Sequence, residues 1–545
     1  MFPILAIIAV WVVMELLVDP RGNFPLNDDW GYAQAVNTLI SEHTLRFAPV
    51  VTMSLAAQVL WGALFCVPFG FSYVALRFST LTLGLVGLVT AYALLRELGA
   101  RREIAVIGSL TMAVNPIYFQ LSNTFMTDVP FLTFGLLSMY CFVRGLRSDS
   151  GAWTWAGVVL ACGATLTRQI GIVIPISFGL GWVVKHGPNA KRIGRAALPA
   201  IIVGATLVAY HARMQATGRL PARYNAQAGA AQEFLTSGLD NVILSTADIA
   251  RTALVYVGLF LLPFLIAVSM GGCEMLSRRQ RVLHWSAAAV VFIVTMATLI
   301  SEGRWMPLCG NCLIDVGVGP TTLSGAAVLP ILDFPSAPGW FWMAVTLAGA
   351  AGGALAFKTV LAAAAGLAAR TVSRSDKAVI AMMLASSVLV FACVAVLAKF
   401  IYFDRYFLFF MPVLMAPAVL TINPGERARH LRAAVVTAIL LAFGVFSTAA
   451  THDYLSWNTA RWRALNDLLR QGVPSERIDG GYEFNGRYNL RLLPDGAWKL
   501  DVAGEYVVTF GQAEGYEEIN RYPYRRWIPP GEGSILVLRD EYYRP

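Results

Sequence analysis

Residues 73–98 have the sequence YVALRFSTLTLGLVGLVTAYALLREL, an apolar run slightly longer than the about 20 residues that a helix needs to cross a bilayer. Similar runs recur along the chain of 545 residues, of which 57% are hydrophobic and 14% charged. A soluble domain carries roughly 25% charged residues. The composition therefore predicts an integral membrane protein and excludes a soluble class.

The apolar runs predict an all-α polytopic membrane protein with about 13 transmembrane helices. The predicted spans are Phe2–Val18, Tyr73–Leu98, Ile104–Leu121, Val129–Gly145, Trp153–Leu166, Ile170–Val184, Ala196–Gln215, Ala253–Met270, Val282–Ile300, Trp340–Ala356, Ala378–Leu397, Tyr406–Thr421 and Ala433–Ala449. The first has no basic residue before it and no small-residue cleavage site, so we expect it to be retained. Two interrupted stretches, about 33–40 and 50–67, predict interfacial helices in the first exported loop, with Pro49 and Pro68 bracketing the second.

Basic residues fall mainly in the short links between these runs. The basic links are Arg101–Arg102, Arg144 with Arg147, Lys185–Arg195, Arg278–Arg281, Arg370–Lys377 and Arg427–Arg432. Successive basic links are separated by two spans, and cytoplasmic loops are the ones that carry such an excess. The pattern predicts a multi-pass protein of the bacterial inner membrane, with its N-terminus cytoplasmic and its C-terminus exported. It also accounts for the net charge of +9 without a nucleic-acid partner.

The tail changes character from about Thr451, where it becomes polar, aromatic and rich in turn signals. We therefore expect two domains, a transmembrane catalytic domain over residues 1–450 and a small exported α/β domain over residues 451–545. Trp462–Leu469 predicts a short amphipathic helix, and Glu505–Phe510 and Ser534–Leu538 predict strands. A domain of about 90 residues buries only a marginal core, so we expect it to rest on the outer loops.

Two adjacent carboxylates, Asp28 and Asp29, lie in the segment NDDWGY (residues 27–32), shortly after the first span. Ionisable groups at a membrane margin are costly and are commonly functional. Either residue could instead cap the helix that follows, and the two roles are compatible. Both are candidate catalytic residues.

Further charged residues lie on the same predicted face. They are Asp128, Arg168, Lys399 and Arg405, the last followed by Tyr406. Carboxylates beside cations suit transfer from a phosphate-linked donor, because an acid can accept the proton of the incoming nucleophile while cations neutralise the departing phosphate. The alternatives are a helix N-cap for Asp128, with Pro130 in the first turn, and an interfacial anchor for Arg405.

Several short motifs occur in a fixed order along the chain. They are the acidic pair, Leu76–Thr80, Tyr92–Gly99, Met126–Phe131, Leu166–Gln169 and Asp404–Leu408. Over about residues 1–450 the chain resembles the GT-C glycosyltransferases that use polyprenyl-phosphate sugars, especially bacterial dolichyl-phosphate-mannose-protein mannosyltransferase and lipid A aminoarabinose transferase relatives. The resemblance implies that Asp28 is the base or acceptor-orienting acid and Asp29 its acidic neighbour. It also implies that Asp128 is the carboxylate of the second loop and that Arg405 and Tyr406 form the late Arg-Tyr pair.

The first loop departs from the family pattern. Members usually carry Pro-Pro after a His or Lys, whereas this chain has TLRFAPV over residues 44–50. This departure leaves the acceptor class open. No exported cluster has clear metal spacing, so we predict no metal ligands and no cofactor, leaving divalent metal dependence open. Cys309 and Cys312 lie in an exported loop where oxidising conditions favour a disulfide, with two free thiols as the alternative.

These expectations combine into one function. We expect a GT-C-type hexosyl or pentosyl transferase that moves a sugar from a polyprenyl-phosphate donor to a lipid, glycan or protein acceptor outside the cytoplasm. Asp28, Asp29 and Asp128 are the predicted catalytic residues. Arg405, Lys399, Arg168 and Tyr406 are the predicted ligands of the lipid phosphate. The alternative is a polyprenyl-lipid or polysaccharide transporter, which would concentrate charge inside its spans and show repeat symmetry.

Overall fold

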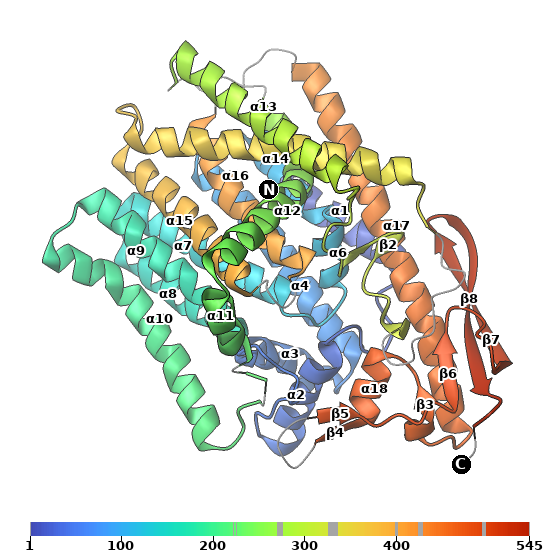
Figure 1. The fold of residues 1–545 in the computed structure, drawn as a ribbon. Coiled ribbons are helices and arrows are strands. Elements are labelled where there is room, and N and C mark those ends of the chain that lie inside the picture. The colour runs from blue at the N-terminus through green and yellow to red at the C-terminus, as the bar shows by residue number, and fades with distance from the viewer. Residues whose placement is uncertain are drawn as a thin grey trace.

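The computed structural model describes residues 2–221, 223–224, 226–269, 276–324, 336–397, 402–422, 429–492 and 498–543. Most of these residues are helical (Figure 1). The α-helices are α1 (Phe2–Val18), α2 (Asp29–Glu42), α3 (Ala56–Phe69), α4 (Tyr73–Glu97), α5 (Arg102–Ala113), α6 (Pro116–Ser122), α7 (Asp128–Ser148), α8 (Gly151–Thr167), α9 (Val173–His186), α10 (Ala190–Ala216), α11 (Ala226–Thr236), α12 (Leu239–Ser269), α13 (Arg278–Ser301), α14 (Gly339–Ala368), α15 (Arg374–Leu397), α16 (Phe410–Thr421), α17 (Arg429–Arg470) and α18 (Tyr482–Tyr488). Short 3₁₀ helices are η1 (Gln169–Ile172), η2 (Thr322–Ser324), η3 (Asp404–Phe409) and η4 (Ser475–Arg477).

The helices confirm a multi-pass membrane protein. Within the described ranges, 10 helices are long and apolar enough to span a membrane, or 11 if the bent pair α5–α6 counts as one span. That pair bends by 64° where Asn115 caps α6 and Pro116 starts it. The helices α1 and α8 are apolar but shorter. The predicted count of about 13 is therefore not confirmed, because length and composition alone do not qualify every apolar run.

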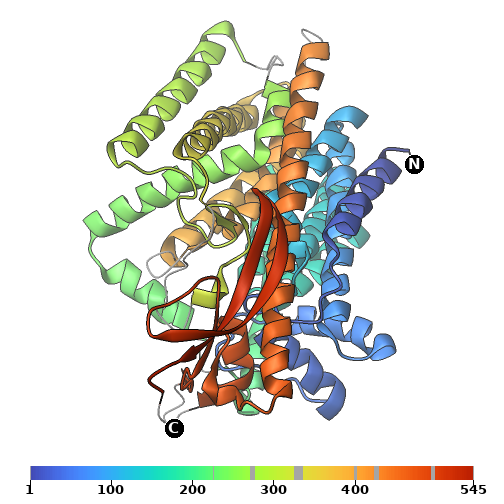
Figure 2. The same ribbon diagram turned by 90° about the vertical axis from the view of Figure 1, so that its right-hand side faces the viewer.

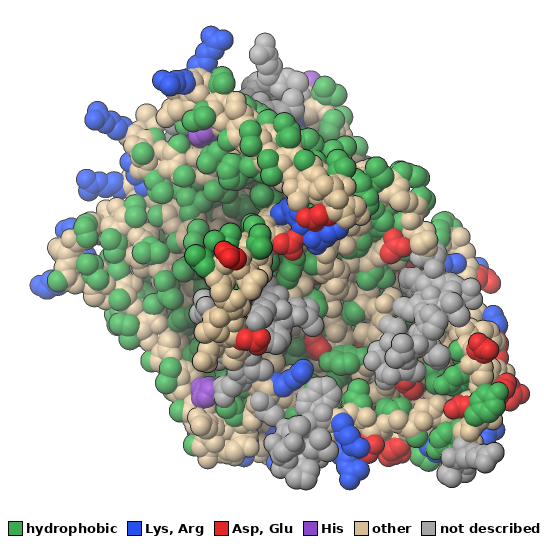
Figure 3. All heavy atoms as spheres, viewed as in Figure 1, with side chains coloured by type: hydrophobic (Ala, Val, Ile, Leu, Met, Phe, Trp, Pro, Cys, Tyr) green, Lys and Arg blue, Asp and Glu red, His purple; other side chains and the backbone are tan. Residues whose placement is uncertain are grey.

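Several of the predicted cytoplasmic links meet in space. Arg144 lies 3.6 Å from Glu97 at the end of α4, and Arg147 lies 3.5 Å from Asp376 in α15. Lys185, at the end of α9, pairs with Asp149 at 2.7 Å. These ion pairs join four links across one end of the helix bundle. Figure 3 shows basic side chains projecting along the upper left edge of the molecule, and acidic side chains together with further basic ones from the middle of that view downward.

The first loop between spans contains two helices, but their bounds differ from the prediction. The first, α2, covers and extends the expected stretch, whereas α3 begins only at Ala56 and contains Pro68 within its last turn. Proline has no backbone N–H, so Pro68 cannot donate to the carbonyl four residues before it. Arg77 of α4 holds the start of this loop. Its buried guanidinium donates to the carbonyls of Pro20 and Gly22.

The C-terminal region begins differently from the prediction. Helix α17 runs unbroken through Thr451 to Arg470, so the expected separate helix over residues 462–469 is the last part of this long helix. The apolar face that predicted it, with buried Leu465 and Leu468, packs inside the molecule. Periodicity fixed the helical state there, but it could not show that the helix continues from a span.

A small mixed sheet follows α17. The strands are β3 (Ile478–Asp479), β6 (Tyr506–Thr509), β7 (Tyr516–Trp527) and β8 (Pro530–Asp540), in the order β3-β6-β8-β7, and only β3 and β6 are parallel. Two strand pairs lie outside it, β1 (Leu313–Ile314) with β2 (Gly317–Val318) and β4 (Leu490–Leu492) with β5 (Trp498–Leu500). Figure 2 shows the β7–β8 hairpin lying along the lower half of α17. Both predicted strands are confirmed: β6 lies within Glu505–Phe510, and Ser534–Leu538 lies within β8.

Candidate active site

Asp28 lies at the start of α2 and faces two other parts of the chain. It occupies the N-cap position, but its side chain makes no capping hydrogen bond. Its Oδ1 accepts a hydrogen bond of 2.7 Å from the Tyr482 hydroxyl, and its Oδ2 lies 3.8 Å from Nη2 of Arg405. The carboxylate is 27% exposed. Asp28 is therefore a partly exposed acid at the edge of a charged cluster. A capping role does not explain the position of its side chain, which makes no capping hydrogen bond.

Asp29 has a different environment from its neighbour. Its side chain is buried, and its two oxygens accept backbone N–H groups of Leu26 at 2.5 Å and Phe125 at 3.2 Å. Burial raises the pKa of Asp29 well above its usual value, against the opposing effect of these hydrogen bonds. With both oxygens occupied by backbone donors, Asp29 ties the first loop to the turn before Asp128. The catalytic role of Asp29 stays a prediction.

Asp128 opens α7 and pairs with Arg168. Its Oδ1 accepts a hydrogen bond of 2.5 Å from Nη1 of Arg168, and both side chains are mostly buried. The N-cap of α7 is Thr127, so the alternative of Asp128 as the cap is wrong. Among the described residues, Oδ2 of Asp128 has no hydrogen-bond partner. One oxygen of this acid is thus left for another group.

Arg405 lies between the two acids. It belongs to η3, its side chain is 4% exposed, and its Nε is 3.9 Å from Oδ1 of Asp128. The aromatic ring of Phe403 lies 4.8 Å from the guanidinium, and Tyr406 lies 5.9 Å from it and 5.1 Å from the guanidinium of Arg168. Nε and Nη1 of Arg405 have no hydrogen-bond partner in the part of the chain that the structure describes. An interfacial anchor would extend to solvent, so that alternative does not fit a buried Arg405.

Asp404 is a site residue whose role the sequence did not indicate. It is fully buried, and it accepts backbone N–H groups of Cys312, Leu313 and Arg405. It therefore attaches the loop before β1 to the residue that carries the central cation. The only signal in the sequence is an acid directly before Arg405, which does not distinguish a positioning role from an ion pair.

A cavity of about 300 Å³ adjoins Asp128, Arg168 and Arg405. Its other walls are mainly apolar and come from several helices. They include Phe131 and Leu132 of α7, Val390 and Val394 of α15, and Leu408 and Phe409 of η3. The cavity is thus bordered by the guanidinium groups of Arg168 and Arg405 and otherwise mainly by apolar side chains.

Lys399, the remaining predicted phosphate ligand, lies outside the described residues. Cys309 and Cys312 are free thiols, so the structure has the alternative rather than the expected disulfide. The backbone N–H of Cys312 is held by Asp404, and that of Cys309 donates to the hydroxyl of Tyr256. These separate attachments orient the two residues independently. Within the described residues, no group of three or more His, Cys, Asp or Glu side chains could hold a metal ion.

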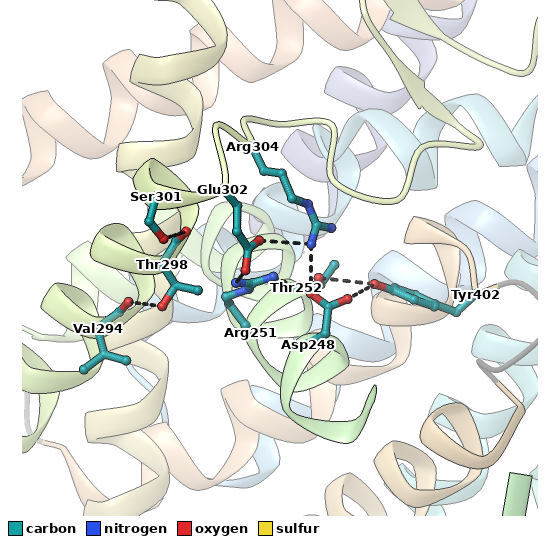
Figure 4. A network of polar contacts seen from close by, with 9 residues as sticks. All are labelled: Asp248, Arg251, Thr252, Val294, Thr298, Ser301, Glu302, Arg304 and Tyr402. Carbon is teal, nitrogen blue, oxygen red and sulfur yellow. Dashed lines mark hydrogen bonds and ion pairs between the residues drawn. The ribbon is translucent and has the colours of Figure 1, made fainter. Parts of the chain in front are cut away.

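A second charged cluster lies between α12, the end of α13 and Tyr402 (Figure 4). Arg251 binds Asp248 and also Glu302 at 2.7 Å, and Arg304 binds Asp248 at 2.9 Å. The Tyr402 hydroxyl donates to Oδ2 of Asp248 at 3.2 Å. Each charge in this network has a partner of opposite sign. The cluster therefore attaches Tyr402, just before η3, to α12. Its paired charges do not suggest a second reactive site.

Residues 56–186 match the family model described as dolichyl-phosphate-mannose-protein mannosyltransferase. Over that segment the chain is similar to this mannosyltransferase family. The match confirms the resemblance to dolichyl-phosphate-mannose-protein mannosyltransferases over these residues. The mannosyltransferase-like segment contains Asp128 and Arg168, whereas Asp28 and Arg405 lie on either side of it in the sequence.

Solved structures give weaker similarities. The chain matches ArnT from Cupriavidus metallidurans bound to undecaprenyl phosphate with 13% identity and a TM-score of 0.40, over 98% of this chain and 97% of that one. It matches the same protein in the apo state with 15% identity and a TM-score of 0.35, over 76% and 77%. No curated protein matches the chain.

Proposed function

We propose that this chain is a glycosyltransferase that moves a sugar from a polyprenyl-phosphate-linked donor to an acceptor on the exported side of the membrane. The observation that carries the proposal is the buried guanidinium of Arg405, with two nitrogens lacking hydrogen-bond partners among the described residues. A buried donor without a partner costs about 1–3 kcal/mol. A phosphate offers the several oxygens that a guanidinium binds best.

The donor's lipid has a matching surface. The cavity beside Arg405 is lined mainly by apolar side chains, which suit a prenyl chain better than a soluble nucleotide. The description of the matching mannosyltransferase family, which names a dolichyl-phosphate donor, supports the same class. Arg168 and Tyr406 border the cavity and complete the proposed phosphate site. Lys399, outside the described residues, stays a predicted ligand.

The proposed reaction is a displacement at the anomeric carbon of the donor sugar. The acceptor oxygen forms a bond to this carbon while the bond to the phosphate oxygen breaks, and the phosphate leaves with the electron pair. Asp28 receives the acceptor's proton, and Arg405 stabilises the charge that develops on the leaving phosphate. Attack opposite the phosphate inverts the anomeric configuration. Asp128 holds Arg168 beside the same phosphate.

We also propose the orientation and division of the chain. The basic links that meet at one end of the bundle are the cytoplasmic face, as positively charged loops generally are. The site at the opposite end then faces the exported side of a bacterial inner membrane. The proposed domains are residues 1–450 and 451–545, with α17 crossing the boundary.

The test uses purified protein in detergent, with no sealed compartment. It is given polyprenyl-phosphate-linked hexoses and pentoses together with lipid, glycan and protein acceptors, and products are detected by mass spectrometry. We expect a new glycosidic bond and release of the polyprenyl phosphate. A transporter has nothing to transport under these conditions, so folded protein that forms no product across the panel would favour transport.

A further inference from the structure

Tyr482, in the C-terminal region, contacts an acid of the candidate active site. This residue begins α18 and lies 454 positions from Asp28, to which it donates the hydrogen bond of 2.7 Å. Burial raises the pKa of Tyr482. The hydroxyl therefore stays protonated near neutral pH and can act as a donor to the carboxylate.

The residue after Tyr482 fixes this contact in place. Glu483 is fully buried and pairs with the equally buried Arg461 of α17 at 2.8 Å. It also accepts the backbone N–H of Asn27 at 2.7 Å and the hydroxyl of Thr322 at 2.8 Å. Breaking a buried ion pair by removing one partner is strongly destabilising, because it leaves an uncompensated buried charge. Tyr482 thus binds Asp28, and the next residue, Glu483, binds the preceding residue, Asn27.

Close packing between α18 and α2 supports the same arrangement. The ring of Trp30 meets the ring of Tyr482 edge to face, with centroids 6.2 Å apart. A Cβ atom at Gly486, one turn further along α18, would lie 2.5 Å from the ring of Trp30. Only glycine permits this approach without displacing the indole. The helix is therefore seated against the segment that carries Asp28.

We infer that Tyr482 is a positioning residue of the active site, supplied by the C-terminal region, which holds Asp28 in the orientation that receives the acceptor's proton. The inference rests on the proposed function. Tyr482 fixes Oδ1, while Oδ2 lies toward Arg405 at 3.8 Å. Without the hydroxyl the carboxylate samples other rotamers, and fewer enzyme molecules are ready for proton transfer.

The first test compares Tyr482→Phe with Tyr488→Phe in the full chain. Tyr488 closes the same helix, and its side chain is 40% exposed. One hydrogen bond to a charged group corresponds to a factor of about 10–100, so we expect Tyr482→Phe to lower kcat by this factor with the donor KM within about twofold. Tyr488→Phe should keep the parental kcat. A parental kcat in Tyr482→Phe, or the same loss in both variants, would overturn the inference.

The second test does not depend on activity. A 3-fluorotyrosine placed at position 482 reports on its hydroxyl environment by ¹⁹F NMR of the full chain in detergent. We expect its signal to move when Asp28→Asn is introduced, and a probe at position 488 to stay unchanged. An unchanged signal at position 482 would refute the contact. A signal that shifts in Asp28→Asn, together with a folded parental chain that transfers no sugar, would instead refute the proposed function while leaving the contact intact.

Discussion

Nε of Arg405 lies 3.9 Å from Oδ1 of Asp128, which is too long for a hydrogen bond. Arg168 occupies that oxygen instead, at 2.5 Å. Arg405 is therefore attracted by Asp28 and Asp128, but these acids do not use all of its hydrogen-bond donors. This leaves the guanidinium with donors for a third group, which is the basis of the proposed phosphate site.

Asp28→Asn tests the proposed base. The amide keeps the shape of the side chain and can still accept the hydrogen bond of Tyr482, but it cannot take a proton at neutral pH. We expect kcat to fall by about 10²–10⁴, the factor attributed to general acid–base groups. The measurement is the initial rate of product formation in detergent. Asp501→Asn, an exposed site paired with Arg491 and Lys499, is the matched control, and equal rates in both variants would contradict the assignment.

Asp29→Asn should act mainly on stability. The amide has one acceptor oxygen for the two backbone N–H groups of Leu26 and Phe125 that the carboxylate accepts. One buried donor is then left unsatisfied, at a cost of about 1–3 kcal/mol. We expect a lower thermal unfolding midpoint in detergent and a smaller loss of kcat than in Asp28→Asn. The reverse ranking of the two kcat values would move the catalytic role to Asp29.

Arg405→Lys tests the phosphate site. Lysine keeps one positive charge but loses the planar fork that can bind two oxygens at once. We expect the donor KM to rise by about 10-fold or more, since a lost hydrogen bond to a charged group is worth roughly 1.5–3 kcal/mol, and Arg405→Ala to weaken donor use further. Polyprenyl phosphate should inhibit the parent competitively against donor and inhibit Arg405→Ala much less. Arg491→Lys, at an exposed position paired with Asp501, is the control. Equal inhibition of the parent and Arg405→Ala would place the phosphate elsewhere.

Reporter fusions test the orientation. A reporter that is active only outside the cytoplasm should work after Gln471, just beyond α17, and should fail near Arg279 or Arg374. The basis is the positive charge of the latter two links. The opposite pattern would place the site in the cytoplasm, where a nucleotide-sugar donor would be the better candidate.

Some parts of the site could be predicted from the sequence and others could not. Asp28, Asp128, Arg168 and Arg405 were expected on one face, and the structure brings them together. Their spacing along the spans made this possible, because loops two spans apart share a side. The distinct environments of Asp28 and Asp29 were not predictable. Adjacent residues at a helix start point in different directions, and their partners come from distant segments.

The sequence by itself determined the membrane class, most helix positions, the shared face of the charged loops and two strands of the tail. These follow from hydropathy, periodicity and the placement of basic residues, which act locally along the chain. Only the tertiary structure decided that Asp404 holds a loop by its backbone and that Tyr482 reaches Asp28. Both contacts join residues more than 90 positions apart. Such contacts arise from packing between segments, and no local pattern records which distant partner a buried polar group will find.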